Sequence, residues 1–185
     1  MTTLGVLPAD YPVTCYSITG YSGGGKKMIA EFEQDGRPVE LDAPAPYAIG
    51  LTHKHLPEMQ RLANLEQPPV FVPVLGDYYK GMATTVMLHN RLLKGAPTAQ
   101  DICDMLAQYY EGSAFVRVAP FGGETPRLHA NTMAGKDWLE LIVSGHAEQT
   151  IITARFDNLG KGASGAAVQN MNIMLGFDEA AGLNV

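Results

Sequence analysis

Seven short segments rich in β-branched and aromatic residues constrain the fold of this chain more than any other feature of its sequence. Runs of this kind, bounded by glycine, proline and small polar residues, are typical of β-strands. We expect strands at residues 13–19, 48–52, 70–75, 82–89, 115–118, 138–144 and 149–156. A short Gly-Asp-Tyr-Tyr-Lys-Gly connection joins the third and the fourth, which predicts that these two strands pair with each other.

Fewer segments have the pattern of a helix. We expect helices at residues 26–33, from His55 to the residue before Pro68, from Thr98 onward, and at residues 161–175. Pro57 suits the first helical position, and Thr98-Ala99-Gln100-Asp101 is typical of a capping box. Because the strands come in runs instead of alternating with helices, the pattern favours an α+β domain with a mainly antiparallel or mixed sheet covered by helices.

The composition limits the partners of the chain. Its 185 residues fit one domain, and 13 basic against 19 acidic side chains give a net charge of −6. Without a run of Lys or Arg, neither nucleic acid nor an anionic membrane is an expected partner. No stretch approaches the ~18 apolar residues of a membrane span. Only two cysteines, Cys15 and Cys103, indicate a reduced, cytoplasmic setting in which both are thiols of the core.

Glycine accounts for 20 residues and gathers where the backbone must turn tightly or approach a partner closely. One cluster, Gly20 to Gly25, follows the first expected strand and precedes Lys26 and Lys27. Consecutive backbone N–H groups in such a loop can form an anion nest, to which Ser22 adds a hydroxyl. A flexible turn without a ligand is the alternative, and the spacing does not match the phosphate loop of nucleoside triphosphatases.

The strongest single motif is His53-Lys54-His55-Leu56-Pro57-Glu58. If the chain is extended up to Pro57, the imidazoles of His53 and His55 project from the same side. Glu58 lies in the first helical turn, within expected reach of the His55 ring, while the helix N-terminus disfavours imidazolium. This combination is typical of a general acid or base near neutral pH. It also suits a site that receives an anionic group such as phosphate.

Two other interpretations of this motif stay open. A His-x-His pair at a strand edge is often only a solvated surface pair. Two histidines and one carboxylate, here His53, His55 and Glu58, are also typical of a metal site. That site would suit a small metal-dependent hydrolase. Because the sequence contains no further cluster of ligands, we assign no metal.

A third segment, Asp157 to Asn170, opens the last expected helix with small residues. Its glycines permit the close approach of another backbone or of a flat ligand, and Asn158 with the helix N-terminus supplies hydrogen-bond donors. Tight packing of the helix against the sheet is the alternative interpretation.

Together, three segments resemble one family. They are Ser22-Gly23-Gly24-Gly25 after a strand, His53-Lys54-His55-Leu56-Pro57-Glu58, and Asn158-Leu159-Gly160-Lys161-Gly162-Ala163 leading to Val168-Gln169-Asn170-Met171-Asn172. In order and spacing they are similar to the C-terminal domain of N-acetyl-gamma-glutamyl-phosphate reductase, in its shorter-chain branch. The resemblance covers nearly the whole chain. It implies the α+β fold of the C-terminal domain of glyceraldehyde-3-phosphate dehydrogenase-like enzymes.

The resemblance also implies a reaction. Members of the family use NADPH to reduce N-acetyl-gamma-glutamyl phosphate to N-acetyl-glutamate semialdehyde and phosphate, through a cysteine thioester, in arginine biosynthesis. By this resemblance His55 is the catalytic acid/base and Glu58 supports it. The residues implied to bind substrate are Ser22, Gly23 and His53, and those implied to contact NADP are Asn158, Lys161 and Gly162.

By the same resemblance, residues 1–185 are one C-terminal domain. The family's dinucleotide-binding domain and its catalytic cysteine fall before the first residue, so NADP would be bound mainly by a domain absent from this chain, and the chain alone would be inactive. Family members associate through this half of the molecule, which implies a homodimer or tetramer.

Three alternatives to this reductase remain. The aspartate-semialdehyde dehydrogenase group shares a similar Asn-Leu-x-Lys-Gly-Ala segment, but the His-x-His-x-Pro-Glu motif argues against it. A non-catalytic oligomerisation or regulatory module with this fold is a second alternative. The metal-dependent hydrolase built on His53, His55 and Glu58 is the third.

Overall fold

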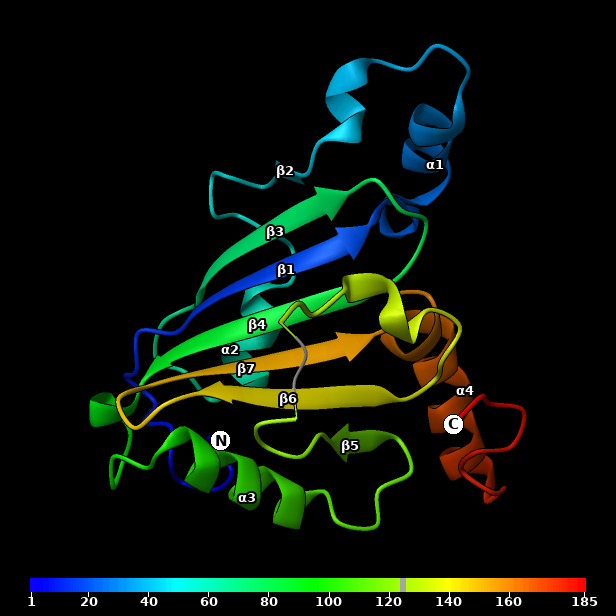
Figure 1. Cartoon of the computed structure of the whole chain (residues 1–185). Coiled ribbons are helices and arrows are strands. Elements are labelled where there is room, and N and C mark those ends of the chain that lie inside the picture. Colours follow the sequence, from blue (N-terminus) through cyan, green and yellow to red (C-terminus); the bar gives the residue numbers. More distant parts are fainter. Residues whose placement is uncertain (124–125) are drawn as a thin grey trace.

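One mixed sheet organises the fold, which a computed structural model describes for residues 1–123 and 126–185. Within these residues the sheet has seven strands in the order β2-β3-β1-β4-β7-β6-β5 (Figure 1). The strands are β1 (Thr14–Gly20), β2 (Ala45–Pro46), β3 (Val70–Gly76), β4 (Met82–His89), β5 (Val116–Val118), β6 (Leu139–Gly145) and β7 (Gln149–Phe156). The expected α+β class with a mixed sheet is confirmed.

Helices and short helical turns connect the strands. The α-helices are α1 (Gly25–Glu33), α2 (Leu56–Leu62), α3 (Ala99–Tyr109) and α4 (Gly165–Leu175). The short turns are η1 (Tyr21–Gly24), η2 (Val39–Asp42), η3 (Asn90–Leu92), η4 (Ala130–Met133) and the π-helical η5 (Gly160–Ser164). The predicted capping box is confirmed: Thr98 Oγ1 accepts from the N–H of Asp101, and Asp101 accepts from the N–H of Thr98. Among the described residues, no helix is long and apolar enough to cross a membrane.

The predicted pairing of residues 70–75 with residues 82–89 is wrong, because β1 lies between these two strands. β1 runs parallel to β3 and antiparallel to β4. Parallel neighbours need a long crossover connection, and the chain supplies one between Gly20 and Val70 that contains α1 and α2. The short connection after β3 therefore passes over the end of β1 and does not form a hairpin.

The strand expected at residues 48–52 is also wrong. This segment forms a turn, in which Ala48 has a φ of 51° and Leu51 a φ of 54°. Left-handed residues of this kind do not occur inside a strand. A two-residue strand, β2, lies just before this turn and pairs with Val74 and Leu75 of β3.

The helix α2 covers one face of the sheet near the start of β1. Leu56 packs there with Cys15 of β1 and Phe71 of β3. Burial raises the pKa of Cys15 to about 11, so the thiol stays protonated at neutral pH and is not an activated nucleophile. The prediction that Cys15 is a core thiol is confirmed.

The helix α3 covers the same face further along the sheet. Ile102, Cys103 and Leu106 belong to one cluster with Leu88 of β4 and Val143 of β6. The side chain of Cys103 is buried, as predicted for a core thiol.

The opposite face of the sheet points toward the viewer in Figure 1. The turn η4 lies over β4 and β7 at one end of this face. At the other end Thr14, Val70, Met87 and Ile151 share one face because they are direct cross-strand partners. Val70, Met87 and Ile151 remain 47%, 38% and 37% exposed. We call these four residues and their surroundings the open face.

Two tyrosine hydroxyls, one with a hydrogen-bond partner and one without, allow a matched test of what such a bond contributes to stability. The Tyr78 hydroxyl is buried without a hydrogen-bond partner in the described residues, and burial raises its pKa to about 12. The Tyr11 hydroxyl accepts from the N–H of His89 at 2.7 Å. We predict that Tyr78→Phe raises the free energy of unfolding in urea by about 1 kcal/mol, whereas Tyr11→Phe lowers it by about 1 kcal/mol. Equal destabilisation by both variants would contradict this assignment.

Candidate functional site

Two glycine-rich segments that are far apart in the sequence meet at one edge of the sheet. The strands β1 and β7 are both antiparallel to β4 between them, and Met82 of β4 pairs with Thr19 of β1 and Phe156 of β7. Both strands therefore end at the same edge, where Ser22 and Asn158 follow. The Asn158 side-chain nitrogen donates to the Ser22 hydroxyl oxygen at 3.0 Å. We call this pair and its surroundings the Ser22–Asn158 site.

Gly81 fixes the orientation of the Asn158 amide. Its N–H donates to Asn158 Oδ1 at 2.7 Å. Because a backbone N–H only donates, the amide oxygen must face Gly81 and the amide nitrogen must face Ser22. Gly81 has a φ of 122°, and a Cβ at this position would lie 2.6 Å from the carbonyl oxygen of Ala130. The position therefore requires glycine.

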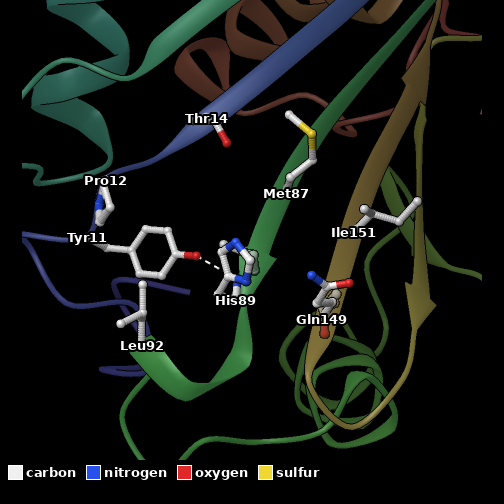
Figure 2. Close-up of a pocket in the computed structure, with 10 residues that line it drawn as sticks. Tyr11, Pro12, Thr14, Met87, His89, Leu92, Gln149 and Ile151 are labelled. Carbon is white, nitrogen blue, oxygen red and sulfur yellow. Dashed lines mark hydrogen bonds between the residues drawn. The ribbon is translucent and has the colours of Figure 1, made fainter.

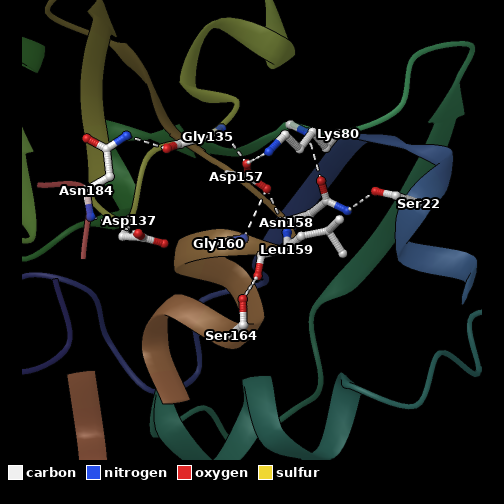
Figure 3. Close-up of polar contacts among 11 residues, drawn as sticks. Ser22, Lys80, Gly135, Asp137, Asp157, Asn158, Leu159, Gly160, Ser164 and Asn184 are labelled. Atoms are coloured by element: carbon white, nitrogen blue, oxygen red, sulfur yellow. Dashed lines mark hydrogen bonds and ion pairs between the residues drawn. The ribbon is translucent and has the colours of Figure 1, made fainter. Parts of the chain in front are cut away.

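A buried carboxylate holds the backbone around Asn158 (Figure 3). Asp157 is fully buried, and its Oδ1 accepts from the N–H groups of Leu159 at 2.8 Å and Gly160 at 3.1 Å. Its Oδ2 accepts from the N–H of Gly135 and lies 3.3 Å from Lys80 Nζ. One side chain thus joins the turn after β7 to the loops before β4 and β6.

These contacts keep Asp157 charged. Burial alone would raise the pKa of its carboxyl, but the hydrogen bonds from Gly135, Gly160 and Leu159, together with Lys80, lower the pKa below the usual value. The carboxylate is therefore an anion at neutral pH, although no part of it is exposed to solvent.

Ser22 is a buried residue that precedes an exposed glycine-rich turn. Its side chain is only 4% exposed, but the neighbouring Gly23 is exposed. A Cβ added to Gly23 would stand 3.4 Å from the Asn158 amide nitrogen, and one added to Gly25 would meet nothing within 4 Å. The predicted substrate-binding residues Ser22 and Gly23 therefore lie beside Asn158, with Gly23 at the surface.

Lys161 and Gly162, the other two residues predicted to contact the cofactor, bond to groups other than Ser22. Lys161 Nζ donates to Gln169 Oε1 at 2.5 Å and lies 5.1 Å from the centre of the Phe115 ring, and burial lowers the pKa of the Lys161 ammonium. The N–H of Gly162 donates to the carbonyl oxygen of Asp157 at 2.8 Å. These groups bond within the chain, and the contact of residues 161 and 162 with a nucleotide stays a prediction.

The histidine motif has a different local structure from the expected one. The chain is not extended up to Pro57: Lys54 and His55 form a turn, with a φ of −85° and a ψ of −7° at His55. Helix α2 begins at Leu56, which makes Pro57 its second residue and not its first. The two imidazoles nevertheless come together, with ring centroids 5.0 Å apart, as the sequence predicted.

His53 is the more enclosed of the two histidines. Its ring lies 5.2 Å from that of Phe71 and 6.0 Å from that of Tyr47, between ring centroids. The N–H of His55 donates to His53 Nδ1 at 3.3 Å. Burial lowers the pKa of His53, and the nearby charges of His55 and Lys54 lower it further.

Glu58 does not contact His55 in this structure. Among residues 1–123 and 126–185, no hydrogen bond or ion pair joins these two side chains, both of which are exposed. No group of three or more His, Cys, Asp or Glu side chains in the same residues is arranged to hold a metal ion.

The two parts of the predicted site lie at different positions along the sheet. His53 contacts Phe71, which pairs with Cys15 near the start of β1, whereas Ser22 follows the end of β1 at Gly20. Five steps of ~3.3 Å between Cys15 and Gly20 correspond to about 16 Å along the strand. The structure brings Ser22 to Asn158 and His53 to His55, but it does not bring these two pairs together.

Sequence reasoning gave no role to Lys80, Gly81 or Asp157. An Asp at the start of a glycine-rich turn is a known signal for side-chain bonds to the following N–H groups. Lys80 and Gly81 carry no comparable signal, because their contact with Asp157 and Asn158 depends on strand order.

A hollow of about 480 Å³ opens on the open face (Figure 2). It extends from the start of β1 across β4 to β7, and its lining includes Tyr11, Thr14, Met87, His89, Gln149 and Ile151. It is therefore distinct from the Ser22–Asn158 site at the opposite end of the strands.

Comparison with known proteins shows the class to which this chain belongs. Over residues 2–158 the chain matches the family described as semialdehyde dehydrogenase, dimerisation domain. The match covers most of the chain, so this protein belongs to that family.

Within this family the chain is similar to one kind of reductase. It is 44% identical over 177 residues to proteins named N-acetyl-gamma-glutamyl-phosphate reductase from Brucella ovis and Brucella canis. The match covers 93% of this chain and 57% of each relative, in the C-terminal part of the relatives. The chain therefore spans a little more than half the length of these proteins. The family resemblance found in the sequence is confirmed.

Solved structures show the same fold. Aspartate semialdehyde dehydrogenase II from Vibrio cholerae superposes with a TM-score of 0.66 at 22% identity, over 88% of this chain and 54% of that one. A probable aspartate-semialdehyde dehydrogenase from Pseudomonas aeruginosa gives a TM-score of 0.62 at 15% identity, over the same shares of the two chains.

The lowered pKa of His53 predicts a pH dependence of stability. The folded state binds a proton at His53 less readily than the unfolded state, whose pKa is near 6.5. The resulting loss of folding stability is absent well above pH 6.5, grows as the pH falls from about 6.5 toward the folded pKa, and is constant below the folded pKa. In urea titrations from pH 7.5 to 5, wild type should therefore lose more stability than His53→Gln. A difference between the two proteins that does not change with pH would contradict this.

Proposed function

We propose that this chain is the substrate-binding and dimerisation part of an NADPH-dependent reductase of N-acetyl-gamma-glutamyl phosphate. In the reaction the acyl phosphate, NADPH and a proton give N-acetyl-glutamate semialdehyde, NADP⁺ and inorganic phosphate. The reaction belongs to arginine biosynthesis and takes place in the cytoplasm. The name and the extent of the Brucella relatives support this proposal.

The hydrogen bond between Ser22 and Asn158 carries the proposal. It joins two of the three segments on which the family resemblance depends, across 136 positions of the chain. Beside it lie the exposed Gly23 and, at the start of α1, the exposed Lys26 and Lys27. A hydroxyl, turn N–H groups and nearby ammonium groups are what a phosphate group needs for binding.

His55 is the proposed acid/base, with Glu58 in support and His53 beside it. An exposed imidazole at the start of α2 can accept and return a proton. Because His55 and Ser22 lie at different positions along the sheet, we propose that the segment around residues 47–55 lies closer to Ser22 in the whole enzyme.

NADPH supplies the hydride when bound. Since Lys161 and Gly162 bond within the chain, we propose that the remaining part of the enzyme binds the nucleotide. This chain would contribute substrate contacts, and a cysteine in that remaining part would form the thioester.

Reconstitution tests this function. The chain is coexpressed with the N-terminal part of the Brucella ovis reductase that it does not match, and oxidation of NADPH by N-acetyl-gamma-glutamyl phosphate is followed. We expect activity from the pair and none from the 185-residue chain alone. His55→Gln should lower kcat of the pair by roughly 10²–10⁴-fold with little change in KM.

Two results would contradict the proposal. The first is reduction of the acyl phosphate by the 185-residue chain alone. The second is an intact pair, shown by copurification, that has no activity, since this would favour a non-catalytic module. Val39→Gln serves as the control variant, because Val39 is 74% exposed and lies in η2, outside the segment of residues 47–55.

We further propose that the open face forms the interface of a homodimer or tetramer. The family is named for dimerisation. Val70, Met87 and Ile151 expose apolar surface beside a hollow, and a face of this kind is stable in water when a second copy covers it.

A charge on the open face should therefore dissociate the oligomer. We predict that Ile151→Asp converts the chain to a monomer at micromolar concentration in sedimentation velocity, without loss of the folded state by circular dichroism. Val39→Asp is the matched control, because Val39 is 74% exposed and lies in η2, away from the open face. A wild type that is already a monomer would contradict the proposed interface.

A further inference from the structure

This inference rests on the proposed function and assigns roles inside the Ser22–Asn158 site. We propose that Asn158 and Asp157 are positioning residues: Asn158 directs the hydroxyl hydrogen of Ser22 toward an oxygen of the acyl phosphate, and Asp157 holds Asn158 in place. Ser22 is then the group that touches the substrate. Asn158 moves from the cofactor, where the family resemblance placed it, to the substrate side of the site.

The directions of the hydrogen bonds decide how the Ser22 hydroxyl is used. Gly81 donates to the amide oxygen of Asn158, which leaves the amide nitrogen facing Ser22. An amide nitrogen only donates, so the Ser22 oxygen is the acceptor in this bond. The Ser22 hydroxyl hydrogen therefore takes no part in the bond with Asn158.

That hydrogen is available for a ligand. In the part of the chain that the structure describes, the Ser22 side chain makes no hydrogen bond besides the one from Asn158. A hydroxyl offers one donor and two acceptor sites. With one acceptor site occupied by Asn158, the donor points away from Asn158 and can meet an anionic oxygen, for which the hydrogen bond is short and strong.

Asp157 binds the residue that follows Asn158 and the residue that precedes Gly81. Leu159, which follows Asn158, donates its N–H to Asp157, and Lys80, which precedes Gly81, forms the ion pair with it. The carboxylate thereby fixes the backbone on either side of the bond between Gly81 and Asn158 (Figure 3). A shift of the backbone at Gly81 or at Asn158 would allow the Asn158 side-chain amide to turn. The hydroxyl hydrogen of Ser22 would then no longer have a fixed direction.

Only an acceptor can occupy position 157. Three N–H groups, from Gly135, Leu159 and Gly160, and the ammonium of Lys80 all point at this one side chain. A carboxylate has about four lone-pair sites and no donor when ionised. An amide at this position would turn an N–H₂ group toward other donors, which moves the turn that carries Asn158.

The two positioning residues and Ser22 should therefore act as one unit. Residues that act through one another show effects that do not multiply in a double-mutant cycle. We measure the KM for acyl phosphate and the KM for NADPH in the reconstituted enzyme, for Ser22→Ala, Asn158→Ala and Asp157→Asn, and for each of the last two combined with Ser22→Ala.

We expect each single variant to raise the KM for acyl phosphate by about 10-fold or more, which corresponds to one hydrogen bond to a charged oxygen. The KM for NADPH should stay unchanged. In the Ser22→Ala background, Asn158→Ala and Asp157→Asn should add less than about 2-fold. Multiplying effects, or a rise in the KM for NADPH, would overturn the proposal. Ser144→Ala on β6 is the matched control for loss of a serine hydroxyl.

A second measurement keeps the test independent of activity and of variant folding. Inorganic phosphate is titrated into the ¹⁵N-labelled 185-residue chain, and the side-chain amide signal of Asn158 and the backbone signal of Gly23 are followed by NMR. We expect both to shift with one saturation curve in wild type, and neither to shift in Ser22→Ala. Phosphate that shifts neither signal in wild type, or shifts both equally in Ser22→Ala, overturns the positioning role. Loss of reductase activity in the wild-type pair with an intact titration instead contradicts the proposed function.

Discussion

The structure depends on a charge that water cannot reach. Asp157 is fully buried, and its carboxylate accepts from backbone N–H groups of two separate segments and pairs with Lys80 of a third. Taking a carboxylate out of water is costly unless hydrogen bonds replace the lost solvation. Here four donors replace it, and the geometry that this requires determines where the turn after β7 and the loop before β4 must lie. The Ser22–Asn158 site exists because these two segments are held together.

Strand order explains why the contacts around Asp157 are not predictable from the sequence. The α+β class, six of the seven expected strands, the capping box at Thr98 and both core cysteines follow from local patterns, and the structure confirms them. The placement of β1 between β3 and β4 does not follow from a local pattern, because a short connection between two apolar strands favours a hairpin. Once β1 and β7 flank β4, Ser22, Gly81 and Asn158 must meet, although 136 positions separate the first from the last.

Like the fold, the candidate site is predictable from the sequence only in part. Ser22, Gly23 and Asn158 were selected one by one from glycine-rich segments, and the structure makes them neighbours. Lys161 is implied only by the family resemblance, and its ammonium bonds to Gln169 and lies over the ring of Phe115. The pairing of His53 with His55 came from an assumed extended segment and is produced instead by a turn.

The surfaces of the chain explain how a domain of this kind serves a larger enzyme. One face of the sheet is covered by α2 and α3, the open face is suited to a second copy, and the edge that carries the buried Ser22 and Asn158 also carries the exposed Gly23, Lys26 and Lys27. We propose that this edge receives the phosphate of the substrate. The decisive test is a crystal structure of the reconstituted enzyme with N-acetyl-glutamate semialdehyde and inorganic phosphate. We expect a phosphate oxygen at about 2.7 Å from Ser22 Oγ, with Asn158 still bonded to the same hydroxyl. A phosphate bound elsewhere, with Ser22 donating to Asn158, would contradict it.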